Sequence, residues 1–381
     1  MNVTTTRQLF ETCRRLVSDP ATRQATLDAI RPRCRGIVGC FSNYIPEEIV
    51  AAAGFHPVRM IGAFAPSAPH RRLFNPVCSF VQDVYAAACA GEFASLDRVV
   101  FPNSCDSLKV LFQMWARDVS APPAAALMHP VCASPEAVAY FAQRLRAFAE
   151  DLQQSPGRRF DDDDLKDTID LYNETRDLLR QVYEMRSRRA GCLSGADAAA
   201  LMTAGLILER PASHAMLRQV IDDTRYAVCP DKGAKRIMLI GPLMDNIALL
   251  DAVEGLGASI VYEETSNGAR YCDGDVETQG DLYENLARRY LTAGPSPTFG
   301  GDAEQEAERF RRRAAELDVD GVIYVNQKYC EPHVHNYLSK AEILKQMQIH
   351  VLMFEVEHGQ SDLSAGDMLR LESFIEIAKR R

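Results

Sequence analysis

The sequence lacks an excess of basic residues: 43 Lys and Arg stand against 52 Asp and Glu, which gives a formal net charge of -9. Because nucleic-acid phosphates are bound by clustered Lys and Arg, this balance argues against a nucleic-acid partner. No apolar run approaches the roughly 20 residues that cross a membrane. The first thirty residues carry acidic groups and no apolar core of a signal peptide. We therefore expect a cytoplasmic protein without a membrane or nucleic-acid partner.

Two glycine motifs of nucleotide-binding proteins are also missing. No G-x-x-x-x-G-K-S/T sequence occurs, and EGLGAS at 254–259 does not match G-x-G-x-x-G. Any ATP hydrolysis that the function requires must therefore take place on another protein. Eleven cysteines are present, but the cytosol keeps thiols reduced, so we expect no disulfide framework. Some of these thiols can then serve as metal ligands.

Short β-rich runs alternate with helical patterns in two parts of the chain, which is typical of parallel sheets covered by helices. From about residue 133 to 228 the β pattern disappears and long helical periods replace it. We predict an α/β fold with two similar doubly wound parallel-sheet units joined by a helical block, divided at 1–135, 136–228 and 229–381. The predicted strands are 36–41, 57–62, 98–102, 124–130, 236–241, 259–264, 321–326 and 350–356. Helices are predicted in the first unit at 45–54, with Pro46 at the first helical position, and at 79–91.

The two units repeat a short pattern. LDRVVFPN at 96–103 and VDGVIYVN at 319–326 each place Asp and Asn six residues apart around an apolar strand. A cysteine follows each Asn, Cys105 in the first unit and Cys330 in the second. An internal duplication accounts for this repeat.

Three cysteines are predicted at helix starts, on the sheet edge where ligands of α/β proteins bind. Cys105 and Cys330 follow strands, and Cys78 precedes the helix that begins at Ser79. A helix N-terminus stabilises a thiolate, so the three side chains could converge between the units. Their spacing is neither that of a zinc ribbon nor that of a ferredoxin. From composition alone, buried or scattered structural thiols are the simpler interpretation.

The segments around these cysteines are NPVCSFVQD, VVFPNSCDS and DGVIYVNQKYCEP. Together with SNYIPEEIVAAAGFHPVRMIG, LARRYL at 286–291 and the closing VLMFEVEHG and LRLESFIEIAKR, they resemble the iron-sulfur subunits of the 2-hydroxyacyl-CoA dehydratase and benzoyl-CoA reductase family. The resemblance covers nearly the whole chain and keeps the motif order of the family.

The resemblance implies a [4Fe-4S] cluster held by Cys78, Cys105 and Cys330, with one iron open to the thioester carbonyl of an acyl-CoA substrate. It implies a lyase: one subunit of an oxygen-sensitive (R)-2-hydroxyacyl-CoA dehydratase, in which one electron converts the thioester into a ketyl radical that expels hydroxide. The implied partners are a paralogous iron-sulfur subunit in a heterodimer and a separate ATP-dependent iron-sulfur activator.

Three alternatives stay open at this point. The same parts serve an ATP-dependent benzoyl-CoA reductase, an oxidoreductase that consumes ATP on every turnover. A homodimer that joins two clusters into a double cubane would reduce small molecules without a paralogous partner. A CoA-binding module that lost its cluster is disfavoured because all three motif cysteines are present.

The proposed chemistry needs a protein acid or base near the substrate. Glu47 and Glu48 follow the first strand and are the candidates, although glutamates in a first helical turn also complement the helix dipole. Ser42 and Asn43 lie in the same loop and are candidates for substrate binding.

Other candidates receive no chemical role. Cys40 ends the first strand and is the main alternative ligand, but the resemblance assigns it none. His333 and His335 form an H-x-H pair that diverges on a helix, and the acidic run 161–164 suits a helix start. The cysteines predicted to be structural are Cys34, Cys89, Cys132, Cys192, Cys229 and Cys272.

Overall fold

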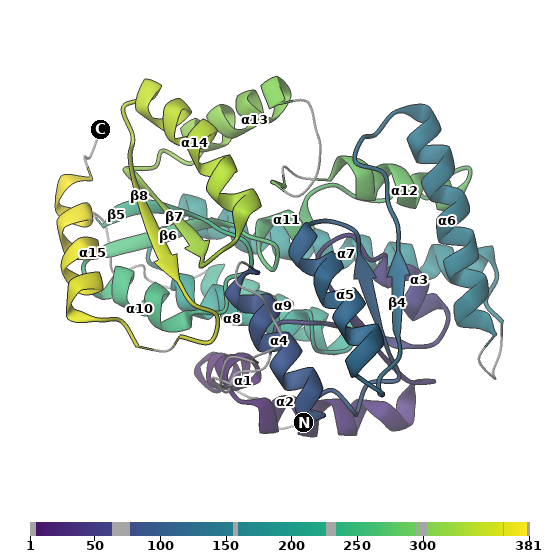
Figure 1. The fold of residues 1–381 in the computed structure, drawn as a ribbon. Helices are drawn as coiled ribbons and strands as arrows, with labels where there is room; N and C mark the ends of the chain where they lie inside the picture. The colour runs from purple at the N-terminus through teal and green to yellow at the C-terminus, as the bar shows by residue number, and fades with distance from the viewer. Residues whose placement is uncertain are drawn as a thin grey trace.

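Two four-stranded parallel sheets organise the chain, and helices cover both faces of each (Figure 1). The strand order is β2-β1-β3-β4 in the first sheet and β6-β5-β7-β8 in the second, so both have one topology. The predicted fold class is confirmed. The computed structural model describes residues 5–62, 77–154, 159–225, 234–293, 296–297, 303–360 and 362–378. The strands are β1 Ile37–Cys40, β2 His56–Arg59, β3 Arg98–Pro102, β4 Ala124–Leu127, β5 Lys235–Ile240, β6 Ala258–Glu264, β7 Gly321–Gln327 and β8 His350–Val356.

Helices connect the strands and fill the stretch between the two sheets. The longest, α7, begins after Asp161, whose carboxylate accepts a 3.0 Å hydrogen bond from the amide of Asp164, so the acidic run has the expected helix-start role. None of the helices in the described ranges is both long and apolar enough to span a bilayer. The helices are α1 Thr6–Ser18, α2 Pro20–Ile30, a 3-10 turn at Arg31–Arg33, α3 Glu47–Ala52, α4 Ser79–Ala90, α5 Asp106–Asp118, α6 Pro135–Gln153, α7 Asp162–Arg188, α8 Gly195–Gly205, α9 Arg210–Arg225, α10 Ile247–Gly255, α11 Ala269–Cys272, α12 Leu282–Thr292, α13 Ala303–Glu316, α14 Glu331–Gln346 and α15 Ala365–Ile377.

The central strands consist of apolar residues because they are covered on both faces, as is usual in parallel sheets. Every residue of β7 is buried, and this strand pairs with β5 on one side and with β8 on the other. The predicted strand 98–102 coincides with β3, and the other predicted strands agree with the structure to within three residues at each end.

The repeated pattern of Asp and Asn has the same structural role in both sheets. Asp97 precedes β3, and its carboxylate accepts a 2.7 Å hydrogen bond from the amide of Ile37 at the start of β1. Asp320 precedes β7 and accepts a 2.8 Å bond from the amide of Arg236 in β5. In return, the amide of Asp97 donates to the carbonyl of Ile37, and the amide of Asp320 donates to the carbonyl of Arg236. Each Asp therefore fastens the beginnings of two central strands together.

The first sheet lies between two helical layers. On the α4 and α5 side, Phe101 of β3 and Trp115 of α5 pack with ring centroids 5.6 Å apart. On the α3 and α6 side, Val100 of β3 and Phe141 of α6 share a core cluster. This second cluster also contains Leu286 of α12, which comes from beyond β6 in the chain.

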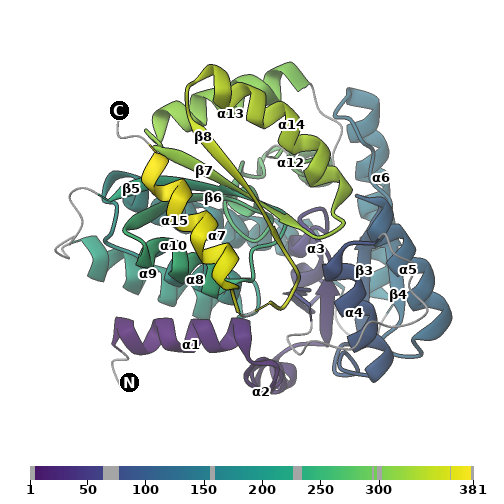
Figure 2. The same cartoon turned by 60° about the vertical axis from the view of Figure 1, so that its left-hand side comes forward.

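The second sheet is covered in the same manner (Figure 2). Helices α13 and α14 lie on one face, where Phe310 and Leu344 pack with Val322 of β7. Helices α10 and α15 lie on the other, where Leu250 and Phe374 share a cluster with the opposite side of the sheet.

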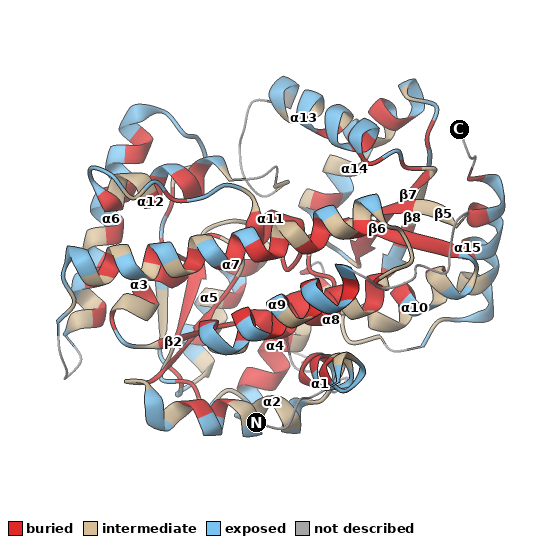
Figure 3. Ribbon diagram, turned by 180° about the vertical axis from the view of Figure 1, so that it is seen from behind, coloured by how far each residue is buried: buried red, intermediate tan, exposed pale blue. Residues whose placement is uncertain are grey.

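The helical block is divided between the two sheets (Figure 3). Helix α6 covers the first sheet, whereas Ala196 of α8 lies in a cluster with Ile237 of the second. The long helix α7 extends across both: Ile169 packs with the first sheet, and Arg186 reaches Glu263 of β6 at 2.7 Å. The domain limits at residues 135 and 228 stay a prediction.

Candidate active site between the two sheets

The three cysteines predicted as ligands occupy the same local position in three helices. Cys78 is the N-cap residue of α4, Cys105 of α5 and Cys330 of α14. Cys105 follows β3 and Cys330 follows β7, the two strands that share the Asp and Asn pattern. The fold thus repeats one thiol position in both units and adds a third in the first unit.

Contacts between the loops bring these positions together at the junction of the two sheets. The amide of Ser79, next to Cys78, donates a 3.1 Å hydrogen bond to the carbonyl of Lys328, in the loop before Cys330. The hydroxyl of Ser107, in the first turn of α5, interacts with the Cys78 thiol. All three predicted ligands belong to or pack against one core cluster.

Burial dominates the electrostatics of these thiols. Burial raises the pKa of Cys78 to about 12, and repulsion from the Cys105 thiolate acts in the same direction. Burial also raises the pKa of Cys330, where repulsion from both other thiolates adds to it, and the pKa of Cys105. The backbone amide three residues along each helix opposes these shifts by stabilising the thiolate. The thiols therefore hold their protons at neutral pH, and binding of the sulfur atoms to a positively charged metal centre would displace these protons into solution.

The donor set suits a metal cluster better than a single ion. Among the described residues, no group of three or more His, Cys, Asp or Glu side chains could hold one metal ion. A [4Fe-4S] cluster is several ångströms across and binds its thiolates at different irons, so its ligands need not meet at one point. Thiolates are the soft ligands that such a cluster takes. Three neighbouring thiols at the starts of different helices, one buried and two partly buried, fit this group.

Cys40, the alternative ligand, has a different environment. Its side chain lies in the core cluster on the α3 and α6 side of the first sheet, whereas Cys78 lies in the cluster on the other side. Burial raises the pKa of Cys40 well above its ordinary value, and the charged groups that act on it are Glu47 and Arg59. The three predicted ligands are not among its electrostatic neighbours.

Glu47 is buried at the start of α3. Pro46 before it is the N-cap residue and not, as predicted, the first helical residue, because its φ and ψ are extended. Arg59, at the end of β2, donates a 3.0 Å hydrogen bond to Oε1 of Glu47, and the Tyr271 hydroxyl donates a 2.9 Å bond to Oε2. Arg59 also bonds the side-chain oxygen of Asn43. Glu47 is therefore part of a buried polar network that links α3, β2 and α11.

Glu48 is fully buried and has an equivalent set of partners. Arg176 of α7 donates a 2.8 Å hydrogen bond to Oε1, and the hydroxyl of Tyr290 in α12 donates a 2.7 Å bond to Oε2. Burial alone would raise the pKa of Glu48, but the charges of Arg176 and Arg289 and these hydrogen bonds outweigh it and hold the pKa below 4.5. Glu48 is consequently ionised at neutral pH.

The two predicted substrate-binding residues line one small cavity. Ser42 and Asn43 border a space of about 30 Å³ together with Arg270, Arg289 and Tyr290. Ser42 has a φ of 60°, a left-handed conformation that costs free energy in a residue other than glycine. The charge of Arg270 also acts on the Cys330 thiol, where it opposes the larger rise in pKa that burial causes.

The H-x-H pair diverges, as the helical spacing predicts. His333 is buried beside Tyr324, whose hydroxyl donates a 2.9 Å bond to the His333 carbonyl, and His335 is exposed. Burial lowers the pKa of His333 well below its ordinary value. Of the cysteines predicted to be structural, Cys192 is disulfide-bonded, which departs from the expectation that the thiols are reduced, and Cys229 lies outside the described residues.

The partners of the two glutamates were not predicted from the sequence. Arg176 and Tyr290 are 128 and 242 residues away from Glu48, so no local pattern connects them. One signal in the sequence of α7 could have indicated them: arginines occur within a stripe of apolar and aromatic residues that has three- and four-residue spacing. Such a stripe is buried, and buried arginines are rare unless they are paired with an acid. The stripe consists of Tyr172, Arg176, Leu179, Tyr183 and Arg186.

Comparison with known proteins gives consistent matches over nearly the whole chain. The lactoyl-CoA dehydratase subunit beta of Anaerotignum propionicum is 23% identical, covering 90% of this chain and 92% of that protein. One benzoyl-CoA reductase subunit of Thauera aromatica is 26% identical over 78% of this chain and 79% of that protein. The (R)-2-hydroxyglutaryl-CoA dehydratase subunit beta of Acidaminococcus fermentans is 20% identical over 97% and 98%. Residues 42–378 match the family described as 2-hydroxyglutaryl-CoA dehydratase, D-component, and the chain belongs to this family.

Proposed function

We propose that this chain is one subunit of an ATP-activated, [4Fe-4S]-dependent (R)-2-hydroxyacyl-CoA dehydratase. The observation that carries the proposal is the position of Cys78, Cys105 and Cys330 at the starts of three helices, all in or against one core cluster, where the first residue of α4 and the loop before α14 are hydrogen-bonded to each other. Family membership and three relatives named as subunits of CoA-thioester dehydratases support the reaction class.

Cys78, Cys105 and Cys330 would hold the cluster. Bound there, it would supply one low-potential electron and a Lewis-acidic iron to the thioester carbonyl of the substrate. The protein part of the site contributes a dry environment, because Cys78 is only 7% exposed and Cys105 and Cys330 pack against an apolar cluster. Low dielectric surroundings strengthen every charge interaction made by the reacting thioester.

The remaining residues of the site would bind the substrate and move its β-proton. Ser42 and Asn43 are candidates for hydrogen bonds to the acyl group, since they line one cavity together with Arg270 and Arg289. Once the hydroxyl group has left, the β-proton is acidic enough for a carboxylate to accept. Glu48 is ionised and so suits a base rather than an acid, and Glu47 is the second candidate.

The inferred partners follow from the names of the relatives, each of which is described as one subunit of an enzyme and two of them as its beta subunit. We infer a paralogous iron-sulfur subunit as the heterodimer partner. A separate ATP-dependent iron-sulfur activator is inferred as well, because the sequence contains no G-x-x-x-x-G-K-S/T motif, the common site of ATP hydrolysis.

A second candidate function is a subunit of ATP-dependent benzoyl-CoA reductase, favoured by the 26% identity to the Thauera aromatica protein. The two functions differ in ATP consumption: a dehydratase returns its electron after each turnover, whereas a reductase uses ATP in every cycle. A homodimeric double-cubane reductase is distinguished by purification, because it needs no second type of subunit.

The test is anaerobic purification followed by iron and sulfide analysis and absorption spectroscopy. Cys78→Ala, Cys105→Ala and Cys330→Ala should each abolish or strongly reduce the cluster signal, because three ligands hold it. Cys40→Ala should keep the signal, since Cys40 lies in another core cluster. Iron loss on Cys40→Ala, or full iron content in any of the three other variants, would overturn the ligand assignment.

A further inference from the structure

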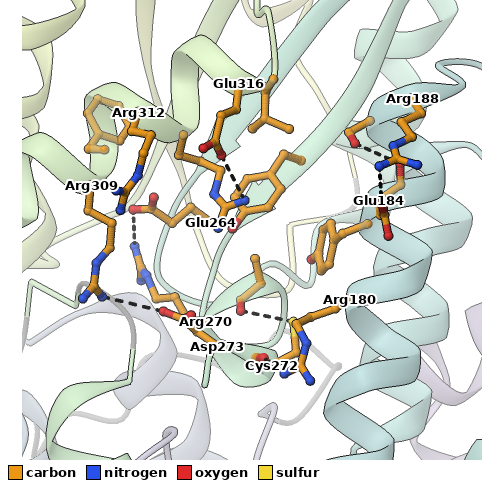
Figure 4. A pocket seen from close by; sticks show the side chains of 17 residues that line it. Arg180, Glu184, Arg188, Glu264, Arg270, Cys272, Asp273, Arg309, Arg312 and Glu316 are labelled. Carbon is orange, nitrogen blue, oxygen red and sulfur yellow. Dashed lines mark hydrogen bonds and ion pairs between the residues drawn. The ribbon is translucent and has the colours of Figure 1, made fainter. Parts of the chain in front are cut away.

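A large arginine-lined cavity opens at the carboxyl end of β6, between α7, α11 and α13 (Figure 4). Its volume is about 660 Å³, within the range of small-molecule sites. Arg180 and Arg188 of α7 lie on one side, and Arg309 and Arg312 of α13 lie on the other. The cavity is thus bordered by positive side chains from two separate helices, and none of its walls belongs to a predicted ligand.

The cavity has more positive than negative side chains. Six arginines face four carboxylates, which leaves an excess of two positive charges. The pairs that do form are loose in two cases: Arg309 is 3.8 Å from Asp273, and Arg313 is 3.8 Å from Glu316. Arg312 has no ion-pair partner among the described residues. Because guanidinium groups bind phosphates in bidentate geometry, this arrangement favours a polyanion with more than one phosphate.

Arg270 connects the cavity to the cysteine site. It lines both this cavity and the small one beside Ser42 and Asn43, and only 6% of its side chain is exposed. Its Nη1 bonds the Gly241 carbonyl at 3.2 Å, but its buried Nε has no hydrogen-bond partner. A buried donor without a partner costs free energy, and a ligand that enters here can satisfy it.

An aromatic wall completes the cavity. Tyr183 and Tyr262 both line it, with ring centroids 5.1 Å apart. The guanidinium of Arg313 stands 5.3 Å from the Tyr262 ring. Tyr183 is buried, so the partly exposed Tyr262 and the Arg313 guanidinium are the groups that a flat heteroaromatic base can contact while its phosphates bind the other arginines.

We propose that this cavity binds the nucleotide end of a CoA thioester, which is its adenosine 3′-phosphate 5′-diphosphate. This inference rests on the proposed function. That group carries roughly four negative charges, because a phosphate monoester alone carries about 1.5 to 2 at neutral pH. A 3′-phosphate and a 5′-diphosphate on one ribose match arginines on two sides of the cavity. The acyl end then extends past Arg270, which lines both cavities, toward Ser42 and Asn43.

A free nucleoside diphosphate shares part of this chemistry, so the ligands compared must separate the two. Isothermal titration of the purified protein with CoA, 3′-dephospho-CoA and ADP does so. We expect CoA to bind about tenfold or more tightly than either of the others, the loss expected for one charge-assisted hydrogen bond. Equal affinity for CoA and ADP would overturn the assignment to CoA, as would the absence of any CoA binding.

Variants on α13 locate the ligand. Arg312→Ala and Arg309→Ala should each weaken CoA binding by about tenfold to a hundredfold, the effect of losing one or two phosphate contacts. Arg311→Ala is the matched control, because Arg311 is on the same helix, bonds Gln346 and does not line the cavity. Circular dichroism of each variant verifies that it is folded. Unchanged CoA affinity in folded Arg312→Ala and Arg309→Ala, or an equal loss in Arg311→Ala, would overturn the site.

This outcome is independent of the cluster, since the titration measures binding of CoA alone. A protein that binds CoA through these arginines but contains no iron would contradict the proposed function and keep this inference. A protein that contains the cluster, but whose CoA affinity is unchanged in Arg309→Ala and Arg312→Ala, would contradict this inference and keep the proposed function.

Discussion

Replacement of Glu48 by Gln tests whether this residue acts mainly in stability or in proton transfer. The change removes one negative charge and leaves the side-chain volume nearly the same. In the structure, Glu48 is fully buried and neutralises Arg176, which is itself 1% exposed. The Gln carbonyl can still accept one hydrogen bond but carries no charge, so only the half-exposed Asp275, 3.6 Å from Nε of Arg176, remains to balance the guanidinium.

The expected cost follows from that imbalance. Removing one partner of a buried ion pair costs about 3–5 kcal/mol, and the retained hydrogen bond places Glu48→Gln near the lower end, at about 3 kcal/mol. This corresponds to a loss of about 150-fold in the ratio of folded to unfolded protein. Because the folded pKa of Glu48 is lowered below 4.5, its contribution is fully present above pH 4.5 and is lost as the pH falls through the folded value.

Urea unfolding of the purified protein measures this difference, at neutral pH and again below pH 4. The control is Glu11→Gln, which changes a surface pair with Arg7 in which the glutamate is 62% exposed and should cost less than about 0.5 kcal/mol. A Glu48→Gln protein as stable as the wild type would refute the reasoning. If the stability is unchanged and turnover falls by about 10² to 10⁴, Glu48 acts as the proton-transfer group and not as a stabilising partner of Arg176.

Three further measurements test other parts of the structure. Glu47→Gln should leave the cluster spectrum intact and slow turnover by about 10² to 10⁴ if Glu47 transfers the proton; unchanged turnover would assign it to the buried network alone. Asp97→Ala and Asp320→Ala should each lower the free energy of unfolding by about 1.5–3 kcal/mol, since both lose equivalent hydrogen bonds to a strand, and markedly unequal losses in urea would contradict the shared role. Burial would lower the pKa of His358, but Asp245, 2.6 Å from Nδ1, and a second carboxylate in α4 outweigh it and raise that pKa above 6.5. The stability that His358 contributes is therefore full below pH 6.5 and declines as the pH rises through the raised value; a His358→Gln protein whose deficit does not shrink with rising pH would contradict this.

The strands and the three helix-start cysteines could be predicted because their signals are local. An apolar run such as VVFP is long enough to identify a buried strand, and the Asn that follows marks its end. The thiol positions then depend only on where each helix begins. Pro46 shows the limit of this reasoning, since it precedes the helix instead of starting it.

The polar network around the glutamates could not be predicted because its members are far apart in the chain. Tyr271 is 224 residues from Glu47 in the chain, and the pairing depends on how α11, which follows β6 of the second sheet, meets α3 of the first unit. The arginine-lined cavity was missed for a similar reason: α7 and α13 are amphipathic surface helices by pattern, and only the folded chain places their arginines opposite one another. Composition alone shows merely that arginines are interspersed with acids.

The position of α12 has a consequence for how the polypeptide can be divided and for the order in which it folds. Leu286 and Tyr290 of this helix complete the core on the α3 and α6 side of the first sheet, although they are synthesised after two strands of the second. A fragment that ends at residue 228 would leave this apolar face uncovered, and exposed faces of that kind aggregate. During translation, the core of the first sheet cannot be completed until the chain has been synthesised as far as residue 290. Closing a core through such distant segments slows folding, so expression of the two halves as separate polypeptides should succeed only when both are made together.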